Sequence, residues 1–518
     1  MFRNMAAETL KNYRKLDIFA KHKIPPTLLN EVVESAKDWA ISHGLVMKFK
    51  ENPALSKHAP FVLFPSPFPT YLYNEAFQVQ KDFQTLFHRA SLDHEFIKDS
   101  LKSVIIHDEF TKLQYDLYEI VRQEGIKPKI YFDIARSDYM IDQVKTEYDS
   151  SKPLTEERPY EIKQIEMNMI AASFSGLSSS MPSLHRYIAS ELEEHSPFNK
   201  EKVSMRVPIN GLGEGMAQAF ELYGNENAVV LFIIETIDLN RFDQKQLTYA
   251  FHEGCQKLGL KKRVRCLFRT FEQVAQNGKL DGDRRLILEN KEVAITYFRT
   301  GYTPCGLSTE ERIGCRLMME RSRSIKCPTI AMQLINTKKV QQVLAKPGMV
   351  EKFIHDENAV RRIRKTFAGL YSLDEGSEGD EAAKMALSDP TKYILKPQRE
   401  GGGNNLYDEE MINELKRVSD KPEERSQYIL MERIRPPVVH NYLIHHDMNK
   451  ETPPVLDETI AELGIFGVHI SVENEEVVNE SAGHLLRTKS IHHNDGGVVS
   501  GLAVLDTPYL YDGESEQK

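Results

Sequence analysis

The sequence predicts a mixed α/β protein, with α/β and α+β parts, on three observations. First, 518 residues are enough for roughly two to four domains. Second, apolar residues recur at helical spacing near the start of the chain, and strand-like and helical segments alternate between residues 228 and 336. Third, short apolar runs separated by loops follow residue 390 and indicate a mostly antiparallel sheet.

The first 120 residues are predicted to be helical. Residues 27–47, TLLNEVVESAKDWAISHGLVM, repeat apolar side chains every three or four positions, and Gly44 interrupts the pattern near its end. Two predicted strands follow, KIYFDIARSDYM at 129–140 and YEIKQIEMNMIAASF at 160–174. In the second segment, apolar and polar residues alternate only in part, so the pattern indicates a strand less strongly there.

A small parallel unit is predicted in the middle of the chain. AVVLFII at 228–234 is typical of a strand buried on both faces, and residues 242–259 have helical periodicity that ends at Gly259. VRCLFRT and EVAITYFR are two further strand candidates, and the unit is expected to end near a helix that begins around Thr337. A strand, a helix and further strands at this spacing favour a parallel arrangement.

The last third of the chain is predicted to contain strands, loops and helices. The basic stretch RRIRK (361–365) is predicted to lie on a helix, and the acidic segment SLDEGSEGDEA (372–382) in a surface loop. YILKPQ, YILMERI and TIAELGIFGVHIS are predicted strands of one sheet, and DEEMINELKRV a helix between them.

Bulk composition argues against several functional classes. A net charge of −9 gives no support to nucleic-acid binding or to binding an anionic membrane. The longest strongly apolar run has seven residues, AVVLFII, too few to cross a bilayer, and no signal peptide is predicted. Five cysteines, an odd number without tight spacing, argue against a disulfide framework and predict a reducing compartment, the cytosol.

Residues 396–405, KPQREGGGNN, place three charged side chains before three consecutive glycines. Such a run weakens a helix or strand, but it allows main-chain N–H groups to approach a ligand closely, most often a phosphate. Neither GxxxxGK[ST] nor a GxGxxG that opens a helix is present in this segment. The segment is therefore predicted to be a flap, with Lys396 facing a phosphate and Glu400 placed to hold a divalent cation.

The same segment, continued to KPQREGGGNNLY, resembles the glycine-rich loop of the eukaryotic glutathione synthetase family, which belongs to the ATP-grasp enzymes. Ten further segments resemble that family in its order: ARSDYM, QIEMN, NRFDQ, YFRTGY, NTKKVQQ, GLYSLD, YILMERI, ELGIFGV, GHLLRTK and DGGV. The resemblance extends from about residue 20 to about residue 510. It implies an ATP-grasp fold with antiparallel sheets, an inserted parallel α/β substrate domain and a glycine-rich lid.

The implied domains are an N-terminal part of the ATP-grasp domain with a helical region (1–227), the inserted substrate domain (228–336) and the C-terminal part (337–518), with the lid at about 373–460. The implied reaction joins γ-glutamylcysteine to glycine while ATP becomes ADP and phosphate, through an acyl phosphate. The resemblance also implies Mg²⁺, as two ions, and a homodimer. Small molecules are the only other partners expected.

For ATP and metal, the resemblance implies a set of charged and amide side chains. Lys338, the first lysine of NTKK, and Lys396 are expected to clamp phosphates, while Lys339 is expected to point to solvent. The metal ligands implied are Glu166 and Asn168, two apart on a strand and so on one face, with Glu400. The ATP contacts implied are Glu166, Lys338, Lys396, Glu400, Gly401, Gly402, Asn405, Tyr407, Met431, Glu432, Arg433, Ile434, Glu462, Lys489 and Asp495.

For the dipeptide, the resemblance implies arginines that bind carboxylates through a bidentate fork. The contacts implied are Arg136, Ile170, Ala171, Ala172, Ser173, Asp238, Asn240, Gln244, Arg299, Tyr302, Arg487, Val498 and Val499. Arg487, Lys338 and Lys396 are expected to act in catalysis. Ala171 departs from the mammalian-type pattern, which has a serine at this position, so one side-chain hydroxyl near the dipeptide is missing.

Three alternatives stay open at this point. The same fold could ligate another amino acid, such as β-alanine or serine, to the same dipeptide. The chain could also be a catalytically inactive relative that acts as a binding protein, although every charged position expected to meet ATP or Mg²⁺ carries a competent residue. A nucleic-acid-binding or scaffold protein is supported only by the RRIRK cluster.

Overall fold

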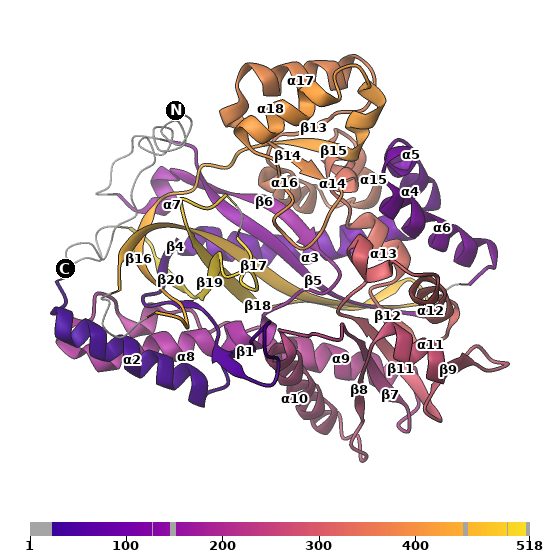
Figure 1. The fold of residues 1–518 in the computed structure, drawn as a ribbon, viewed down its shortest axis with the longest axis horizontal. Helices are drawn as coiled ribbons and strands as arrows, with labels where there is room; N and C mark the ends of the chain where they lie inside the picture. Colours follow the sequence, from indigo (N-terminus) through magenta and orange to yellow (C-terminus); the bar gives the residue numbers. More distant parts are fainter. Residues whose placement is uncertain (1–22, 127, 146–151, 449–453, 495, 514–518) are drawn as a thin grey trace.

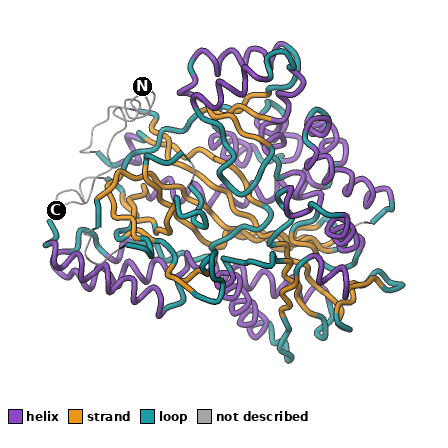
Figure 2. The backbone as a smooth tube through the Cα atoms, in the orientation of Figure 1, coloured by secondary structure: helices purple, strands orange, loops and turns teal. Residues whose placement is uncertain are grey.

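The structure is a computed structural model that describes residues 23–126, 128–145, 152–448, 454–494 and 496–513. Within these residues the chain forms a mixed α/β fold with three larger sheets and two small two-stranded ones, as Figures 1 and 2 show. In the part of the chain that was searched, no helix is both long and apolar enough to cross a membrane. All five cysteines are free thiols.

A seven-stranded sheet forms the centre of the molecule (Figure 1). Neighbouring strands are antiparallel except for β3 and β19. In spatial order its strands are β16 (Val439–Ile444), β3 (Phe61–Val62), β19 (Ala503–Asp506), β18 (Glu475–Ser490), β17 (Leu456–Val472), β5 (Ile130–Gln143) and β6 (Tyr160–Asn168). The two-stranded sheets pair β1 (Val46–Lys48) with β2 (Ser56–His58), and β4 (Ser66–Pro69) with β20 (Pro508–Tyr511).

The two faces of the seven-stranded sheet carry different elements. Because side chains alternate along a strand, Arg136 and Asp138 of β5 lie on one face and Asp133 on the other. Helix α9 (Ile209–Tyr223) packs on the Arg136 face, where Gly215 approaches Val468 so closely that a Cβ would be 2.4 Å from its side chain. Helix α3 (Thr70–Ser91) covers the opposite face.

A six-stranded sheet contains the predicted parallel unit. Strands β8 (Cys266–Arg269), β7 (Val229–Ile233), β11 (Lys291–Phe298) and β12 (Ile325–Cys327) are parallel, and β10 (Leu286–Leu288) and β9 (Gly278–Leu280) continue the sheet antiparallel. All five residues of β7 are buried, and they alternate between two apolar clusters. The continuous apolar run at 228–234 therefore predicted a two-faced strand correctly.

A separate three-stranded sheet carries the strands that flank the glycine segment. Strand β15 (Tyr428–Glu432) lies between β13 (Leu370–Ser372) and β14 (Tyr393–Pro397), and all pairs are antiparallel. The prediction of one sheet for YILKPQ, YILMERI and TIAELGIFGVHIS is thus wrong, because the third segment, β17, belongs to the central sheet. Helices α17 (Ser377–Ser388) and α18 (Asp408–Arg417) pack on this small sheet, as seen at the top of Figure 1.

The acidic segment 372–382 is not the predicted loop, since α17 begins at Ser377. The alanines of α17, including Ala382 and Ala386, are buried against the small sheet. Glu378 and Asp380 lie in the first turn, where negative charge is favourable at the positive end of the helix dipole. An acidic run at a helix start, followed by small apolar residues, thus forms a packed helix rather than a solvated loop.

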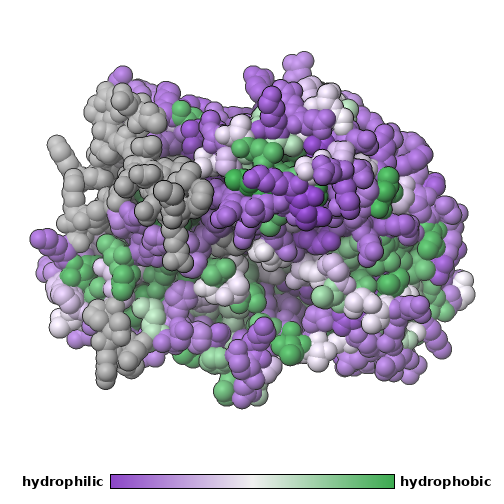
Figure 3. Space-filling view, turned by 45° about the horizontal axis from the view of Figure 1, so that its top comes forward, coloured by the Kyte–Doolittle hydropathy of each residue, from purple (hydrophilic) through white to green (hydrophobic). Residues whose placement is uncertain are grey.

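The remaining helices surround the sheets. Residues 23–123 are largely helical as predicted, although the four short strands β1–β4 interrupt them. The other α-helices are α2 (Pro26–Ser42), α4 (His94–Leu101), α5 (Val104–His107), α6 (Glu109–Gln123), α7 (Leu154–Glu157), α8 (Ser175–Leu192), α10 (Arg241–Lys257), α11 (Phe271–Asn277), α12 (Glu310–Arg321), α13 (Ile330–Ile335), α14 (Lys338–Ala345), α15 (Met349–Phe353) and α16 (Glu357–Thr366). The helices predicted near 242–259, after Thr337 and over RRIRK are α10, α14 and α16. Hydrophilic side chains cover most of the face in Figure 3.

Candidate active site

A cleft of about 940 Å³ lies between the three-stranded and the seven-stranded sheets and is lined by residues of both. Most of the residues that the sequence predicted for a site line this one cleft. They are Arg136, Glu166, Asn168, Ile170, Ala171, Ser173, Tyr302, Lys338, Lys396, Glu400, Gly401, Gly402, Asn405, Tyr407, Met431, Glu432, Arg433, Ile434, Glu462, Arg487, Lys489, Val498 and Val499.

Strand periodicity places the acidic and amide groups of the cleft on one face of the central sheet. Glu166 and Asn168 are two apart on β6, so both project to the same side. On the neighbouring strand β5, Asp138 pairs with Glu166 and Arg136 pairs with Asn168 in the register. The motifs ARSDYM and QIEMN are therefore adjacent in space, although about 30 residues of chain separate them.

Lys338 joins the two carboxylates predicted to bind metal. It is the first residue of α14, and its ammonium lies 2.9 Å from Glu166 Oε2 and 2.7 Å from Glu400 Oε1. The side chain is only 3% exposed. A buried cation between two half-buried carboxylates satisfies both, and it brings the glycine segment into contact with the central sheet.

These close charges shift the pKa values of their neighbours. Burial alone raises the pKa of the Glu166 carboxyl, but Lys338 and Lys396 outweigh burial and lower this pKa to about 2. Burial raises the pKa of Glu400 against the opposing effect of Lys338, and repulsion from Glu166 adds to the rise. Glu166 is thus held as a carboxylate, whereas Glu400 is the more easily protonated of the pair.

Lys396 projects from β14 into the cleft and is 2% exposed. Its ammonium donates to the main-chain oxygen of Ile165 at 3.0 Å and lies 3.7 Å from the sulfur of Met431. Burial lowers the pKa of this lysine to about 8, against the raising effect of Glu166. The protein supplies few acceptors for this ammonium, so an anionic ligand in the cleft would improve its surroundings.

The glycine segment adopts the backbone conformation that requires glycine. Gly401, Gly402 and Gly403 have φ values of +100°, +74° and +73°, in the region that L-residues with a side chain rarely adopt. A Cβ on Gly401 would be 3.5 Å from the ring of Tyr302, which places the loop beside the 300–302 turn. The expected glycine turn is therefore present, and Gly401 and Gly402 line the cleft.

A second loop meets the glycine segment at the mouth of the cleft. The hydroxyl of Tyr407 donates to the main-chain oxygen of Asn494 at 3.4 Å, and Asn405 donates to that hydroxyl at 3.3 Å. Lys489 of β18 also donates to the Asn494 oxygen. The segments that carry GGGNNLY and GGVV thus contact each other across the mouth. Asp495, one of the predicted ATP contacts, lies outside the described residues.

Asp138 was not predicted as a site residue, yet it organises the arginines of the cleft. Arg136 donates to both of its carboxylate oxygens at 2.6 and 2.8 Å, and Arg487 donates to Oδ2 at 2.9 Å. Asn168 Nδ2 also donates to Oδ2, at 2.9 Å. Asp138 stands two residues after Arg136 in ARSDYM, so strand alternation on one face was the signal that could have identified it.

Arg399 is a second residue that sequence reasoning missed. It lines the cleft, and its guanidinium pairs with Asp108 at the start of α6 and with the Gln398 main-chain oxygen. Its position inside KPQREGGG was visible in the sequence, but nothing there distinguished it from an exposed charge. The cleft also contains apolar residues that were not predicted, among them Ile394 and Ile460.

Five predicted substrate residues do not line the cleft within the described residues: Ala172, Asp238, Asn240, Gln244 and Arg299. Arg299 contacts the loop at 171–173 directly, and Asn240 supports the following residues through Asp243. Arg299 donates to the main-chain oxygen of Ala172 at 3.1 Å and to the hydroxyl of Ser173 at 2.5 Å. Gln244 donates to Asp238 at 3.0 Å, and Asn240 donates to Asp243, which accepts from three main-chain N–H groups at residues 174–177.

One side chain, that of Lys339, differs from its predicted orientation. Lys339 does not reach solvent: it is 2% exposed, and its ammonium lies 2.6 Å from Asp374 and 3.1 Å from the Ser372 hydroxyl. Consecutive helical residues diverge by about 100°, so Lys338 and Lys339 point to different neighbours. The carboxylate of Glu432 accepts from the hydroxyl of Tyr371 at 2.6 Å and is thus engaged with the small sheet.

Fold and site together define a mixed α/β protein with a deep cleft in which lysines, arginines and carboxylates from separate sheets converge, an arrangement suited to an anionic ligand. The family model described as "Eukaryotic glutathione synthase, ATP binding domain" matches residues 26–510. The chain therefore belongs to the eukaryotic glutathione synthase family. The resemblance inferred from eleven short segments is confirmed.

Individual relatives agree with this assignment. Human glutathione synthetase is 43% identical over 485 residues, which cover 93% of this chain and 97% of the human protein. A chloroplastic glutathione synthetase of Arabidopsis thaliana is 34% identical over 501 residues, 95% of this chain and 87% of its own length. Among solved structures, a glutathione synthetase-like effector from Globodera pallida in its apo form is similar with a TM-score of 0.71 and 27% identity, covering 96% of this chain and 100% of that chain.

Proposed function

We propose that this protein is an ATP-dependent ligase that joins γ-glutamylcysteine to glycine and releases glutathione, ADP and phosphate. Membership of the family over nearly the whole chain supports the reaction. The observation that carries the proposal is the cluster of Lys338, Glu166, Glu400 and Lys396, which line one cleft together with the glycine-rich loop. Those groups are what transfer of a phosphoryl group requires, namely fixed charge and alignment.

In this proposal ATP lies between the two sheets. Lys396 and Lys338 bind phosphate oxygens as point charges, and Met431 to Ile434 line the side that would face the adenine ring. Glu462 and Lys489, from β17 and β18, would meet the ribose and phosphates, and Asn405 with Tyr407 would cover them. The glycine loop offers its main-chain N–H groups, as the sequence predicted.

The oxygen donors of the cleft fit Mg²⁺. Glu166 and Glu400 supply half-buried carboxylates, and the amide nitrogen of Asn168 donates to the protein. No described residue donates to the amide oxygen of Asn168, so a cation can use it. Hard oxygen donors of this kind suit Mg²⁺, which completes its ligands with phosphate and water. We propose that two Mg²⁺ ions are held here, where they supply positive charge to the phosphates.

The dipeptide would lie beside Arg487 and Arg136. Arg487 is shared between Asp138 and Glu462, so it is fixed on the central sheet with part of its fork directed at the cleft. Ser173, Val498 and Val499 complete this end of the cleft. Arg299 supports the loop at 172–173 from behind, so its contribution to dipeptide binding is through that loop.

The chemistry proceeds in two steps. A carboxylate oxygen of the dipeptide attacks the γ-phosphorus, the bond to the β-phosphate oxygen breaks, and ADP leaves. The amine of glycine then attacks the acyl carbon of the acyl phosphate, an amide bond forms, and phosphate leaves with the electrons of the C–O bond. The two meeting loops exclude water, which would otherwise hydrolyse the acyl phosphate.

The larger-scale assignments are part of the same proposal. An ATP-grasp fold would comprise residues 1–227 and 337–518, with a lid at about 373–460 that includes the small sheet and its helices. Residues 228–336 would form the inserted substrate domain around the six-stranded sheet. We also propose a homodimer in the cytosol, in keeping with the family and with five free thiols.

The test is ADP release by the purified protein with Mg²⁺, ATP and γ-glutamylcysteine, with glycine added or withheld. We expect turnover and glutathione formation only when glycine is present. A rate with β-alanine or serine as high as that with glycine would assign the protein to another amino acid. Absence of ADP release under every condition would favour a binding protein.

Two variants connect this assay to the cleft. Glu400→Ala and Lys396→Ala are expected to abolish coupled ADP release, because each removes one charge that the phosphates or the cations need. Circular dichroism and thermal unfolding should show that both variants are folded. Normal turnover in either folded variant would contradict the phosphate-site assignment.

A further inference from the structure

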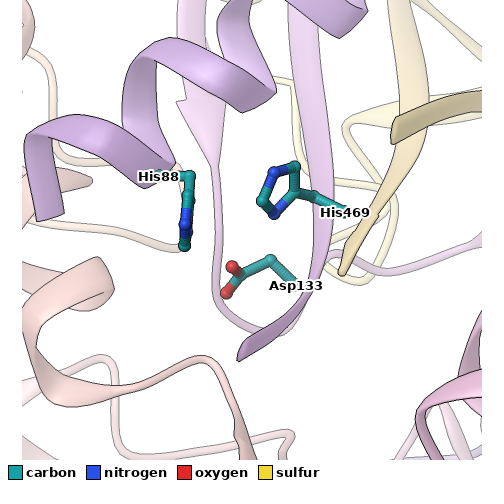
Figure 4. A group of neighbouring side chains, drawn as sticks. All are labelled: His88, Asp133 and His469. Atoms are coloured by element: carbon teal, nitrogen blue, oxygen red, sulfur yellow. The ribbon is translucent and has the colours of Figure 1, made fainter. Parts of the chain in front are cut away.

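Three buried side chains meet on the face of the central sheet that α3 covers. His88 comes from α3, Asp133 from β5 and His469 from β17, and one ligand atom of each lies within 4.8 Å of the others. Their exposed fractions are 4%, 2% and 1%. Figure 4 shows the two imidazole rings and the carboxylate around one shared space.

This cluster is separate from the cleft. Asp133 and His469 are direct partners in the register of β5 and β17, so they project to the same face. Arg136 and Asp138 stand an odd number of residues from Asp133 and project to the opposite face. The cluster and the cleft thus lie on the two sides of one sheet.

The atoms of the cluster that could bind a ligand have no hydrogen-bond partners among the described residues. His88 Nδ1 and His469 Nδ1 are buried, and neither has a hydrogen-bond partner. No described residue donates a hydrogen bond to the Asp133 carboxylate. Buried polar atoms are nearly always paired in folded proteins, so two orphan nitrogens that share one space with a carboxylate indicate a missing ligand.

The other nitrogen of each ring is already held. His469 Nε2 lies 3.1 Å from Glu476 Oε2, and His88 Nε2 lies 3.0 Å from the hydroxyl of Ser471. A histidine that donates from Nε2 to a carboxylate carries its lone pair on Nδ1, which is the tautomer that binds a metal. Such hydrogen bonds to the far side of the ring are typical around ligating histidines.

We propose that His88, Asp133 and His469 bind one Zn²⁺ ion per chain. Two imidazole nitrogens and one carboxylate oxygen form a common zinc set, with a water molecule as the fourth ligand. A dication would neutralise the buried carboxylate and use both orphan nitrogens. The donors need to move somewhat closer together than 4.8 Å, because bonds of about 2.0–2.2 Å place tetrahedral ligands nearer to one another.

The ion would tie α3 to two strands of the central sheet. It would lie near the turn that joins β17 and β18, where the side chain of Glu476 is 41% exposed and marks a route to solvent. Nitrogen donors distinguish this site from the all-oxygen set of the cleft, which suits Mg²⁺. Zinc bound only by the folded chain stabilises that chain.

The experiment measures zinc in the full-length protein in excess Mg²⁺. Zn²⁺ is added, unbound metal is removed by gel filtration, and metal content is determined. We expect about one Zn²⁺ per chain in the wild type and its loss in Asp133→Asn and His469→Asn. His185→Asn is the matched control, because His185 is also buried with an orphan Nδ1 but stands in α8, outside the cluster. It should retain zinc, and so should Glu400→Gln.

A second measurement covers the case in which the cluster variants do not fold. X-ray absorption at the zinc edge of the wild-type protein should show imidazole scattering and no sulfur, and added Zn²⁺ should raise the midpoint of thermal unfolding. Absence of bound zinc in the wild type would overturn the proposal, as would zinc retained by a folded Asp133→Asn variant. An all-oxygen shell would also overturn it, because it would place the zinc in the cleft.

Discussion

The wall of the cleft and the layer directly behind it contain the same kinds of residue in different settings. Lys338 and Arg487 line the cleft, whereas Lys339 and Arg299 lie behind it. All four side chains are largely buried and hydrogen-bonded to acceptors of the protein. Lys338 and Arg487 bond to acceptors at the cleft, where a ligand could also reach them. Arg299 instead bonds to the loop at 172–173, and Lys339 bonds to the three-stranded sheet and the residues after it.

The difference shows that residue type and burial do not separate binding groups from supporting ones. Lys338 lies between two carboxylates that also border the cleft, so a ligand can compete for every charge in the group. Lys339 pairs with Asp374 and Ser372 of the small sheet and joins α14 to it. The two lysines differ in the direction in which they project from the axis of α14, and this direction, not the residue type, determines which neighbours each one contacts.

The largest effect is expected for Lys338→Ala, which tests a residue of the cleft wall. Removing this ammonium leaves Glu166 and Glu400 without the cation between them and removes a proposed phosphate contact, so kcat should fall by about 10³-fold or more. ADP release with γ-glutamylcysteine and glycine measures it. Turnover within tenfold of wild type would show that Lys338 has a supporting role like that of Lys339 and does not bind phosphate.

Arg487→Lys is expected to have the next largest effect. Lysine keeps the charge but loses the planar fork, of which Nη2 alone donates to both Asp138 and Glu462, so kcat/KM for the dipeptide should fall by about 10–100-fold. Steady-state kinetics with varied dipeptide gives this number. A fall confined to the KM for ATP would contradict the placement of Arg487 beside the dipeptide.

Arg299→Lys tests the rear arginine. The shorter cation cannot reach both the Ala172 oxygen and the Ser173 hydroxyl, so the loop loosens and the KM for the dipeptide should rise by about tenfold, the equivalent of one charged hydrogen bond. The KM for ATP should stay unchanged, because the loop is bonded to Arg136 and Arg299, whereas Lys338 and Lys396 bond to other partners. An equal rise in both KM values would indicate a general loss of structure instead.

Lys339→Met is expected to leave kcat within about twofold, the smallest effect on activity. Its cost should appear in stability, where loss of a charged hydrogen bond lowers the free energy of unfolding by about 1.5–3 kcal/mol. Chemical denaturation measures this, and Asp374→Asn is the matched partner variant. If Lys339→Met lost as much activity as Lys338→Ala, the division into wall and support would be wrong.

Sequence reasoning was most successful where short-range patterns determine the structure. The two-residue spacing of Glu166 and Asn168 and the uninterrupted apolar run 228–234 each predicted a face or a burial that the structure has. The resemblance then gathered residues from distant segments into one cleft, which periodicity alone could not do. The roles of those residues in binding remain proposals.

The errors share one physical cause, the dependence of a side chain on a partner far away in the sequence. Lys339 was expected in solvent because its acceptors, Asp374 and Ser372, are more than 30 residues further along. The acidic run before α17 was predicted as a loop because the burial of Ala382 depends on the small sheet. Asp138 was overlooked because the residues that converge on it come from three strands.

The contact between Tyr407 and Asn494 has a consequence for the passage of molecules in and out of the protein. A single hydrogen bond of 3.4 Å contributes only about 1 kcal/mol net, so the two segments can separate at small cost. This bond alone therefore does not keep the cleft closed, and in the proposed reaction bound substrates would have to hold the two segments together during a turnover.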